Sequence, residues 1–238
     1  MQGVVFAAGE GTRMRPLTDD RPKGLVEVAG TPLLTHCFET LVDLGVDELV
    51  PVVGYRGEQI RDHYGDRFDG VPVTYAEQTE RTGLAHAALA ADPHVDGDFL
   101  AMNGDNVFDA DLAAVRRRHE STDADVTLLV DEVSREVARR TGVLERDDAG
   151  RVTGLVEKPA DPPSTTVPRG FYAFSPRIFD ACRAVDPAPT GEYELTHAVD
   201  DLLAAGGTVE TVPLDGWATN VNTPADREAA TDHLTGTD

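Results

Sequence analysis

The stretch "GVVFAAGEGTRMRPLTDDRPKGL", residues 3–25, joins an apolar run to a glycine-rich basic loop. The apolar residues 3–9 end in glycine, as expected for a buried central strand of a parallel sheet. Gly9 and Gly11 let the backbone turn sharply and approach a ligand closely. Successive backbone N–H groups in such a loop can hold phosphate oxygens. The stretch therefore predicts a phosphate-binding edge of an α/β fold.

Strand-like and helix-like segments alternate along the rest of the chain, apart from a hairpin pattern at residues 142–159. Thr31 and Thr223 are suitable helix N-caps, and glycines follow several helical segments. This βαβ rhythm predicts an α/β fold with a right-handed, doubly wound, mostly parallel, Rossmann-like sheet. We predict further strands at 47–55, 71–78, 98–106, 124–132, 169–175 and 208–214, and helices at 32–44, 58–64, 83–91, 109–119, 192–207 and 223–234.

The chain is strongly acidic, with 43 aspartates and glutamates and a formal net charge of −22. Nucleic acids and anionic membranes need a basic face on their partners, so we expect neither as a partner. No run of about 18 apolar residues occurs, which argues against a membrane-spanning helix. Lys23 and Lys158 are the only lysines among 21 basic side chains. Dispersed acid with little lysine predicts adaptation to high intracellular salt.

Two cysteines, Cys37 and Cys182, lie far apart in helical segments, and the seven histidines form no metal-binding pattern. We therefore expect buried free thiols in a reducing cytoplasm and no histidine-based metal site.

Three kinds of phosphate-binding loop compete to explain the basic stretch. A Walker A loop, GxxxxGK[ST], is absent, and a dinucleotide fingerprint would have a third glycine where Met14 stands. The full stretch "GEGTRMRPLTDDRPKGL", residues 9–25, resembles the signature loop of the sugar-1-phosphate nucleotidylyltransferases, G-x-G-T-R-x-x-P-L-T followed by P-K. The resemblance continues in order through "EQTERTGLAHAAL", "NGDN", "TGV", "VEKP" and "NVNTPAD", and so covers most of the chain.

The resemblance implies the nucleotide-diphospho-sugar transferase fold and an enzyme that joins a nucleoside triphosphate to a sugar 1-phosphate, releasing pyrophosphate. The "GLAHA" and "GDN" forms favour the branches that use dTTP or UTP, such as glucose-1-phosphate thymidylyltransferase and UTP–sugar-1-phosphate uridylyltransferase. We expect a single domain over 1–238, with 1–110 binding mainly the nucleotide and 111–238 mainly the sugar phosphate. A homo-oligomer stays open.

The attacking phosphate oxygen in this reaction is already an anion, so the chemistry needs fixed cations rather than a general base. The resemblance gives catalytic roles to Arg13, Lys23 and Asp105, with Arg13 on the β- and γ-phosphates and Lys23 on the α-phosphate. It places Gln78 at the edge of a pyrimidine. The nucleotide-binding set is Ala8, Gly9, Gly11, Thr12, Arg13, Lys23, Gln78, Gly83 and Asp105, and the sugar-phosphate set is Gly142, Glu157, Lys158 and Glu194. The alternative for Glu194 is simply the start of a helix.

The resemblance also implies Mg²⁺ as the cofactor. Asp105 would bind the ion through a hard carboxylate oxygen. Asn220 is the second expected ligand, because it occupies the position of a second metal-binding aspartate in many members. The alternative is that Asn220 only bonds the backbone and shapes a turn.

Two other functions stay open on the sequence. One is a non-catalytic regulatory homologue that binds nucleotide sugars; Arg13, Lys23 and Asp105 argue against it, while Asn220 leaves it open. The other is a nucleotidyltransferase of the same fold with a different acceptor, such as a molybdopterin guanylyltransferase or a phosphocholine cytidylyltransferase. The "VEKP" motif favours a sugar phosphate.

Overall fold

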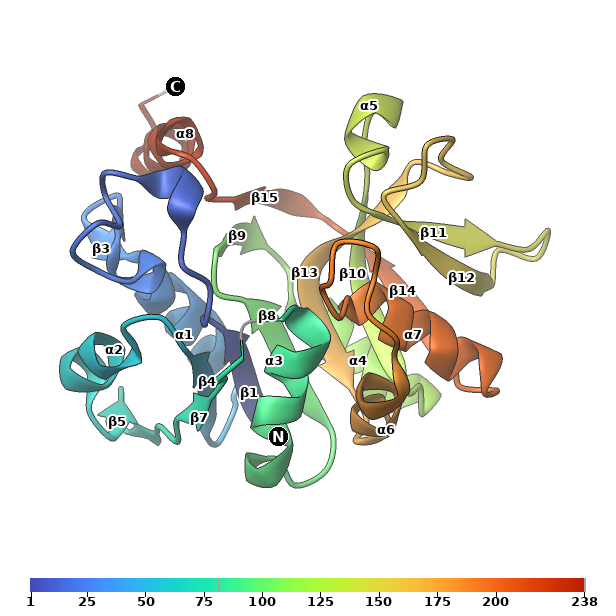
Figure 1. Ribbon diagram of the computed structural model, residues 1–238, viewed down its shortest axis with the longest axis horizontal. Coiled ribbons are helices and arrows are strands. Elements are labelled where there is room, and N and C mark those ends of the chain that lie inside the picture. Colours follow the sequence, from blue (N-terminus) through green and yellow to red (C-terminus); the bar gives the residue numbers. More distant parts are fainter. Residues whose placement is uncertain (81, 238) are drawn as a thin grey trace.

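A central sheet organises the computed structural model, which describes residues 1–80 and 82–237. Seven strands of the described part form this sheet in the order β14-β10-β13-β8-β1-β4-β7 (Figure 1). They are β1 (Gln2–Phe6), β4 (Leu49–Val53), β7 (Ala76–Glu77), β8 (Phe99–Asn103), β10 (Val126–Glu132), β13 (Thr166–Phe174) and β14 (Val209–Pro213).

The sheet is mostly parallel, as predicted. β1 lies between β4 and β8 and is parallel to both, so that Gly3 pairs with Leu49 on one side and Leu100 on the other. β13 is antiparallel to both of its neighbours, β8 and β10. Of these seven strands, β13 therefore runs opposite to the other six. The expected α/β fold class is confirmed.

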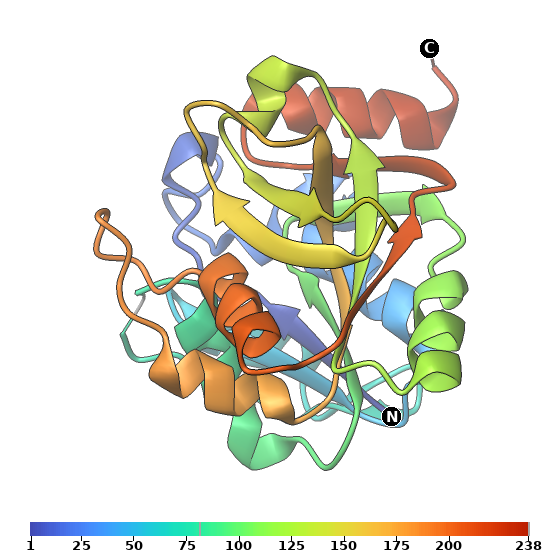
Figure 2. The same ribbon diagram turned by 90° about the vertical axis from the view of Figure 1, so that its right-hand side faces the viewer.

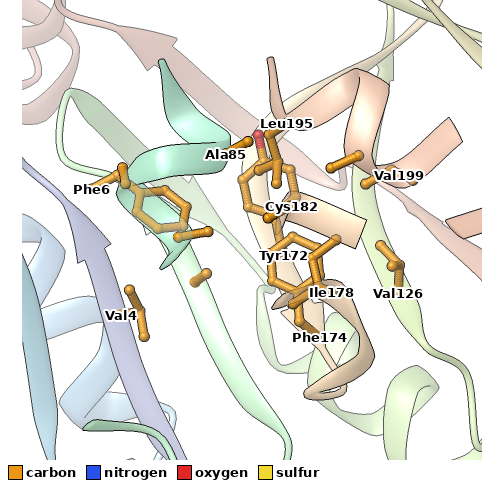
Figure 3. Packing of buried hydrophobic residues seen from close by; sticks show 14 of the residues in the cluster. Val4, Phe6, Ala85, Val126, Tyr172, Phe174, Ile178, Cys182, Leu195 and Val199 are labelled. Atoms are coloured by element: carbon orange, nitrogen blue, oxygen red, sulfur yellow. The ribbon is translucent and has the colours of Figure 1, made fainter. Parts of the chain in front are cut away.

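Helices cover both faces of the sheet, which makes it doubly wound. Along β1, Val4 and Phe6 face one hydrophobic cluster and Val5 faces another, as strand alternation requires. Residues of α3, α6 and α7 complete the first cluster (Figure 3), and those of α1, α2 and α4 complete the second. These helices are α1 (Leu33–Asp43), α2 (Gly57–Tyr64), α3 (Leu84–Ala91), α4 (Ala113–Thr122), α6 (Arg177–Ala184) and α7 (Leu195–Ala204).

Smaller elements surround the central sheet (Figure 2). The predicted hairpin forms as β11 (Gly142–Arg146) and β12 (Val152–Glu157), next to the short helix α5 (Arg135–Ala138). Three further two-stranded pairs are β2 (Glu27–Val28) with β3 (Thr31–Pro32), β5 (Arg67–Phe68) with β6 (Val71–Pro72), and β9 (Asn106–Ala110) with β15 (Gly216–Asn220). The last helix is α8 (Pro224–Thr235), and the 3₁₀ turns are η1 (Thr12–Met14), η2 (Lys23–Leu25) and η3 (Asp92–His94).

Helix α8 begins as predicted. Thr223 is its N-cap, and the Thr223 hydroxyl accepts from the backbone of Asp226 while the Asp226 carboxylate accepts from the backbone of Thr223. This reciprocal capping box satisfies two N–H groups at the helix start.

The prediction that Thr31 caps the first helix is wrong. Ala29 and Gly30 have φ angles of 52° and 81°, the conformation of a tight hairpin turn. This turn joins β2 to β3, and Thr31 pairs with Val28 across it. The helix starts at Leu33 instead.

Other predicted elements also differ in extent. The helix expected at 192–207 forms as the shorter α7 (Leu195–Ala204), and the strand expected at 98–106 ends at Asn103. The strand expected at 71–78 is broken into β6 and β7. The helix expected at 109–119 begins only at Ala113, because Asp109 and Ala110 belong to β9 and pair with β15.

Both cysteines, Cys37 and Cys182, are buried free thiols, as expected. Burial raises the pKa of Cys182 to about 12, and the pKa of Cys37 is also raised by burial and then by the charge of Asp105. No helix of the described residues is both long and apolar enough to cross a lipid bilayer.

Candidate active site

Two cavities adjoin at the edge of the sheet where β1, β7 and β8 end. The first has a volume of about 430 Å³ and is lined by residues that follow these three strands. The second, of about 380 Å³, is lined by residues of β11, β12, β13 and α7. They share Leu84, Asn103, Glu194 and Asn222. Ligands of open α/β sheets bind at this end of the strands.

Every residue predicted to bind the nucleotide lines the first cavity. These are Ala8, Gly9, Gly11, Thr12, Arg13, Lys23, Gln78, Gly83 and Asp105. They come from three separate stretches of sequence, so their convergence depends on the fold. Their roles in binding and catalysis stay predictions.

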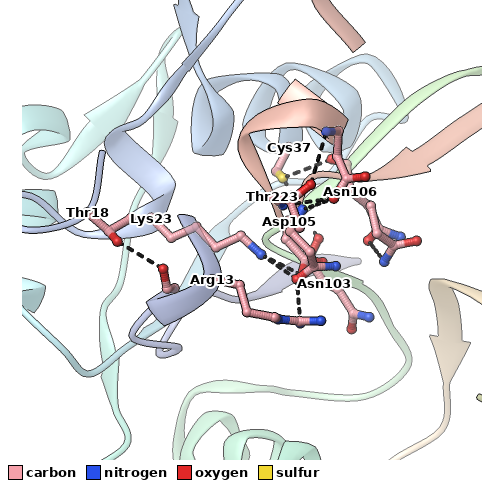
Figure 4. A network of polar contacts seen from close by, with 12 residues as sticks. Arg13, Thr18, Lys23, Cys37, Asn103, Asp105, Asn106 and Thr223 are labelled. Atoms are coloured by element: carbon pink, nitrogen blue, oxygen red, sulfur yellow. Dashed lines mark hydrogen bonds and ion pairs between the residues drawn. The ribbon is translucent and has the colours of Figure 1, made fainter. Parts of the chain in front are cut away.

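Two cations, Arg13 of the loop after β1 and Lys23 at the start of η2, meet at one point. Lys23 lies 2.8 Å from a carboxylate oxygen of Asp105 and donates a second bond, of 2.9 Å, to the side-chain oxygen of Asn222. The Arg13 guanidinium donates to the same oxygen of Asn222 at 2.9 Å. Figure 4 shows Arg13 and Lys23 reaching toward Asp105 from the loop side.

The glycines of this loop are needed for two different reasons. Gly11 has a φ of +66°, and a Cβ atom there would lie 2.9 Å from the Cβ of Lys23. Gly11 therefore allows Lys23 to pack closely against the loop. A Cβ atom at Gly9 would meet no described atom within 4 Å, so Gly9 keeps open a space in the cavity wall.

Gln78 and Gly83 meet at the opposite wall of the first cavity. The buried Gln78 side chain donates a bond of 3.0 Å to the carbonyl oxygen of Gly83. This bond uses one amide hydrogen of Gln78 and holds the orientation of its side chain.

The predicted sugar-phosphate residues divide between the two cavities. Gly142 and Glu157 line the second, Lys158 lines the first, and Glu194 lines both. Thr196 donates to Glu157 at 2.9 Å, and a Cβ atom at Gly142 would lie 2.5 Å from Thr196. Gly142 thus permits this wall to close, while its role toward a sugar stays a prediction.

A short ion-pair chain joins the two cavities. The Lys158 ammonium lies 2.9 Å from Glu157 and 3.4 Å from Glu194. The hydrogen bond that the Lys158 ammonium donates to Glu157 raises the pKa of Lys158. Burial, followed by the charge of Glu157, raises the pKa of Glu194 above its ordinary value. Glu194 also stands at the N-cap position of α7, so the two interpretations of this residue are compatible.

Asn220 does not lie where the sequence analysis expected it. Its side chain donates to Asn106 at 2.7 Å, opposite its partner in the β9–β15 ladder, and it lines the second cavity rather than the Asp105 cavity. Asn222 lines the Asp105 cavity instead, because the Val221 backbone bonds to Asp105 and the Asp226 cap holds the Asn222 backbone; the Mg²⁺ role of either asparagine stays a prediction. The missed signal was position: Asn222 directly precedes the predicted cap Thr223.

The oxygen atoms near Asp105 fit a hard cation. One carboxylate oxygen of Asp105 and the side-chain oxygen of Asn103 are buried and have no hydrogen-bond partner. Unpartnered buried oxygens are costly, and Mg²⁺ prefers oxygen ligands of these kinds. Within residues 1–80 and 82–237, no group of three or more histidine, cysteine, aspartate or glutamate side chains could hold a metal ion.

Comparisons with known proteins find similar chains over almost the whole length of this one. A UTP–glucose-1-phosphate uridylyltransferase of Haloferax volcanii, AglF, is 51% identical over 98% of this chain and 96% of its own length. A glucose-1-phosphate thymidylyltransferase of Streptomyces antibioticus is 36% identical over 95% of this chain and 64% of its own length. The bifunctional protein GlmU of Methanocaldococcus jannaschii is 33% identical, and this chain spans 54% of it.

Solved structures share the fold. A UDP-glucose pyrophosphorylase in complex with UDP-glucose superimposes with a TM-score of 0.89 at 20% identity, covering 100% of this chain and 99% of that one. The apo form of a UDP-glucose pyrophosphorylase gives 0.91 at 19% identity, with the same coverage. The 51% and 36% identical relatives confirm the resemblance to sugar-1-phosphate nucleotidylyltransferases. Residues 2–219 also match the family model described as nucleotidyl transferase, and the chain belongs to that family.

Proposed function

We propose that this protein transfers a uridylyl group from UTP to a hexose 1-phosphate, giving a UDP-sugar and pyrophosphate. The observation that carries the proposal is the junction of the two cavities. A cavity bearing Arg13 and Lys23 meets a second one bearing Glu157, and Lys158 and Glu194 stand between them. Two substrates bound there would meet at their phosphates.

The first cavity suits a nucleoside triphosphate. Arg13 and Lys23 supply positive charge next to a glycine loop that leaves space at Gly9. Cations held in advance at such a position stabilise the charge that develops on the α-phosphate and on the departing pyrophosphate. Since the sugar phosphate oxygen that attacks is already ionised, no side chain has to remove a proton from it.

The part of the first cavity next to Gln78 and Gly83, which we call the base pocket, suits uracil. Gln78 keeps an amide oxygen and one amide hydrogen after its bond to Gly83, and these complement the N–H and carbonyl of a pyrimidine edge. UTP is favoured over dTTP because the 51% identical relative is a UTP-using uridylyltransferase.

The second cavity suits a neutral hexose. Glu157 and Glu194 offer carboxylate oxygens that accept from sugar hydroxyls, and Leu155 and the ring of Tyr172 are among the other residues that line the wall. Lys158 lies at the junction, where its ammonium would hold the sugar phosphate for in-line attack.

Asp105 would hold Mg²⁺, with the side-chain oxygens of Asn222 and Asn103 as further candidates. When bound, Mg²⁺ neutralises phosphate charge and orients the phosphates. The protein itself supplies the oxygens and keeps Lys23 within reach of the same carboxylate.

We further propose that the enzyme works in a cytoplasm of high salt. The excess of acidic side chains supports this, as does the origin of the 51% identical relative in Haloferax volcanii, a halophile.

The test is a matrix of UTP, dTTP, ATP, GTP and CTP against several sugar 1-phosphates, with Mg²⁺, read by pyrophosphate release at low and molar KCl. We expect the fastest turnover with UTP and a hexose 1-phosphate. A preference for GTP or CTP would overturn the base assignment, and no pyrophosphate release with any pair would favour the non-catalytic homologue.

A further inference from the structure

Tyr193 stands between residues of the two cavities. Its neighbour Glu192 lines the first cavity, and its other neighbour, Glu194, lines both. Tyr193 itself is half-buried and packs against the first hydrophobic cluster. In Figure 1 the loop that carries it, between α6 and α7, lies beside the start of α3.

The backbone of Tyr193 is bonded in both directions to the start of α3. Its N–H donates to the carbonyl of Thr82 at 2.6 Å, and its carbonyl accepts from Ala85 at 3.0 Å. The Tyr193 ring stacks on His86, with centroids 3.9 Å apart and planes inclined by 16°. Thr82 in turn bonds to the His86 ring. These contacts fix the loop to the helix.

Gly83 makes this contact unusually close. A Cβ atom at Gly83 would lie 2.4 Å from the carbonyl oxygen of Tyr193, and the φ of Gly83 is +116°. The backbone that receives the Gln78 hydrogen bond is therefore packed directly on Tyr193. A shift of Tyr193 would displace the wall of the base pocket.

The other side of Tyr193 leads at once to the sugar-phosphate residues. Glu194, the next residue, begins α7 and lies 3.4 Å from the Lys158 ammonium. Thr196, two residues further, holds Glu157. The four-residue segment 193–196 thus sets both the position of the loop and the positions of the Glu157 and Glu194 carboxylates.

We infer that Tyr193 is a positioning residue through which nucleotide binding favours sugar-phosphate binding. A base held by Gln78 and Gly83 restricts the motion of the segment Thr82–His86, which contains Gly83. The stacked Tyr193 is restricted with it, so a sugar phosphate that binds next loses less conformational entropy when Glu194 and Lys158 become ordered. This inference rests on the proposed function, because it takes UTP and a sugar phosphate as the two ligands.

The test measures binding by calorimetry with Mg²⁺, using the unreactive analogue α,β-methylene-UTP and glucose 1-phosphate. In the wild type we expect the analogue to tighten glucose 1-phosphate binding at least about fivefold, and glucose 1-phosphate to tighten analogue binding by the same factor. Tyr193→Ala should bring both factors to within about twofold of unity. Tyr193→Phe, which keeps the stacking ring, should retain the wild-type factor.

His86→Ala removes the same stack from the helix side and should also abolish the coupling, which keeps the test usable if Tyr193→Ala does not fold. Hydrogen exchange gives a second measurement: the analogue alone should slow exchange in residues 186–194 of the wild type and of Tyr193→Phe, but not of Tyr193→Ala. Coupling that persists in a folded Tyr193→Ala or His86→Ala protein overturns the inference. If the wild type binds both ligands without coupling, the inference alone fails. If it binds neither, the proposed function fails with it.

Discussion

Lys23 donates a 2.9 Å hydrogen bond to the side-chain oxygen of Asn222, although 199 positions separate the two residues in sequence. The same ammonium lies 2.8 Å from Asp105. One cation thus joins the glycine-rich loop, the residues after β8 and the start of α8. The positive charge that balances Asp105 in the first cavity therefore comes from the glycine-rich stretch that carries Lys23, and not from a strand end.

Removal of the Lys23 ammonium should slow catalysis strongly. In Lys23→Ala we expect kcat for pyrophosphate release to fall about 10²–10³-fold, as for the loss of one preorganised charge-stabilising donor. Arg21→Ala is the matched control, because Arg21 lies in the same loop but is exposed and pairs with Asp20; its rate should stay near wild type. Near-normal turnover of Lys23→Ala would remove Lys23 from the mechanism.

Asn222 and Asn220 should differ in their effect on the Mg²⁺ requirement. Asn222→Ala should raise the Mg²⁺ concentration for half-maximal activity and lower kcat, and Asn222→Asp should retain substantial activity because it keeps an oxygen ligand. Asn220→Ala should leave the Mg²⁺ midpoint unchanged and lower the melting temperature, since it loses the bond to Asn106. A Mg²⁺ titration of the three variants decides the matter, and the reverse pattern would restore Asn220 as the ligand.

Glu194 should oppose stability at neutral pH. Its pKa is raised in the folded protein by burial and then by Glu157, so its contribution to stability is fully present below the unfolded pKa, about 4.3, and is lost as pH rises through the folded pKa. Glu194→Gln should therefore unfold at higher urea than wild type near pH 7.5, with a smaller difference near pH 4, while weakening sugar-phosphate binding.

The control for this change is Glu192→Gln, which removes an acidic charge from the exposed loop nearby. The difference in stability between Glu192→Gln and wild type should depend much less on pH. Equal stability of Glu194→Gln and wild type at both pH values would contradict the raised pKa of Glu194.

Salt should stabilise the protein. Repulsion among 43 acidic side chains is screened when the Debye length falls to about 3 Å at 1 M salt. We expect the melting temperature to rise continuously from low to molar KCl, as measured by calorimetry. A flat or falling melting temperature would rule out the proposed adaptation to salt.

Much of the fold could be predicted from local pattern. The apolar runs around Val4, Val50 and Leu100 indicated buried parallel strands, and the capping sequence at Thr223 indicated a helix start. The elements that were missed or misplaced depend on pairing between distant segments. Asp109 resembles a helix start by composition, yet it belongs to β9. That strand pairs with β15, which lies more than 100 residues away in sequence. Such pairing leaves no local signal.

The candidate site, like the fold, could be predicted from the sequence where local motifs define it and not where distant segments meet. Sequence motifs found the residues that line the first cavity, because each lies in a short stretch of distinctive spacing. The choice between Asn220 and Asn222 required the fold, since both lie in "NVNTPAD" and only the bond from Val221 to Asp105 places one of them beside Lys23. No motif singled out Tyr193, whose backbone bonds to Thr82 and Ala85 and whose ring stacks on His86, more than 100 residues away in sequence.

The segment 216–235 returns from the far end of the sheet to the N-terminal half. β15 pairs with β9, and α8 bonds to the β2–β3 turn through Thr231 and to Glu27 through Arg227. Because Asn222 lies in this segment, the first cavity is completed by residues that leave the ribosome after nearly all of the sheet. The nascent chain therefore carries Arg13 and Lys23 before their shared partner Asn222 is made, and the contacts between them form only after the strands of the central sheet have been synthesised.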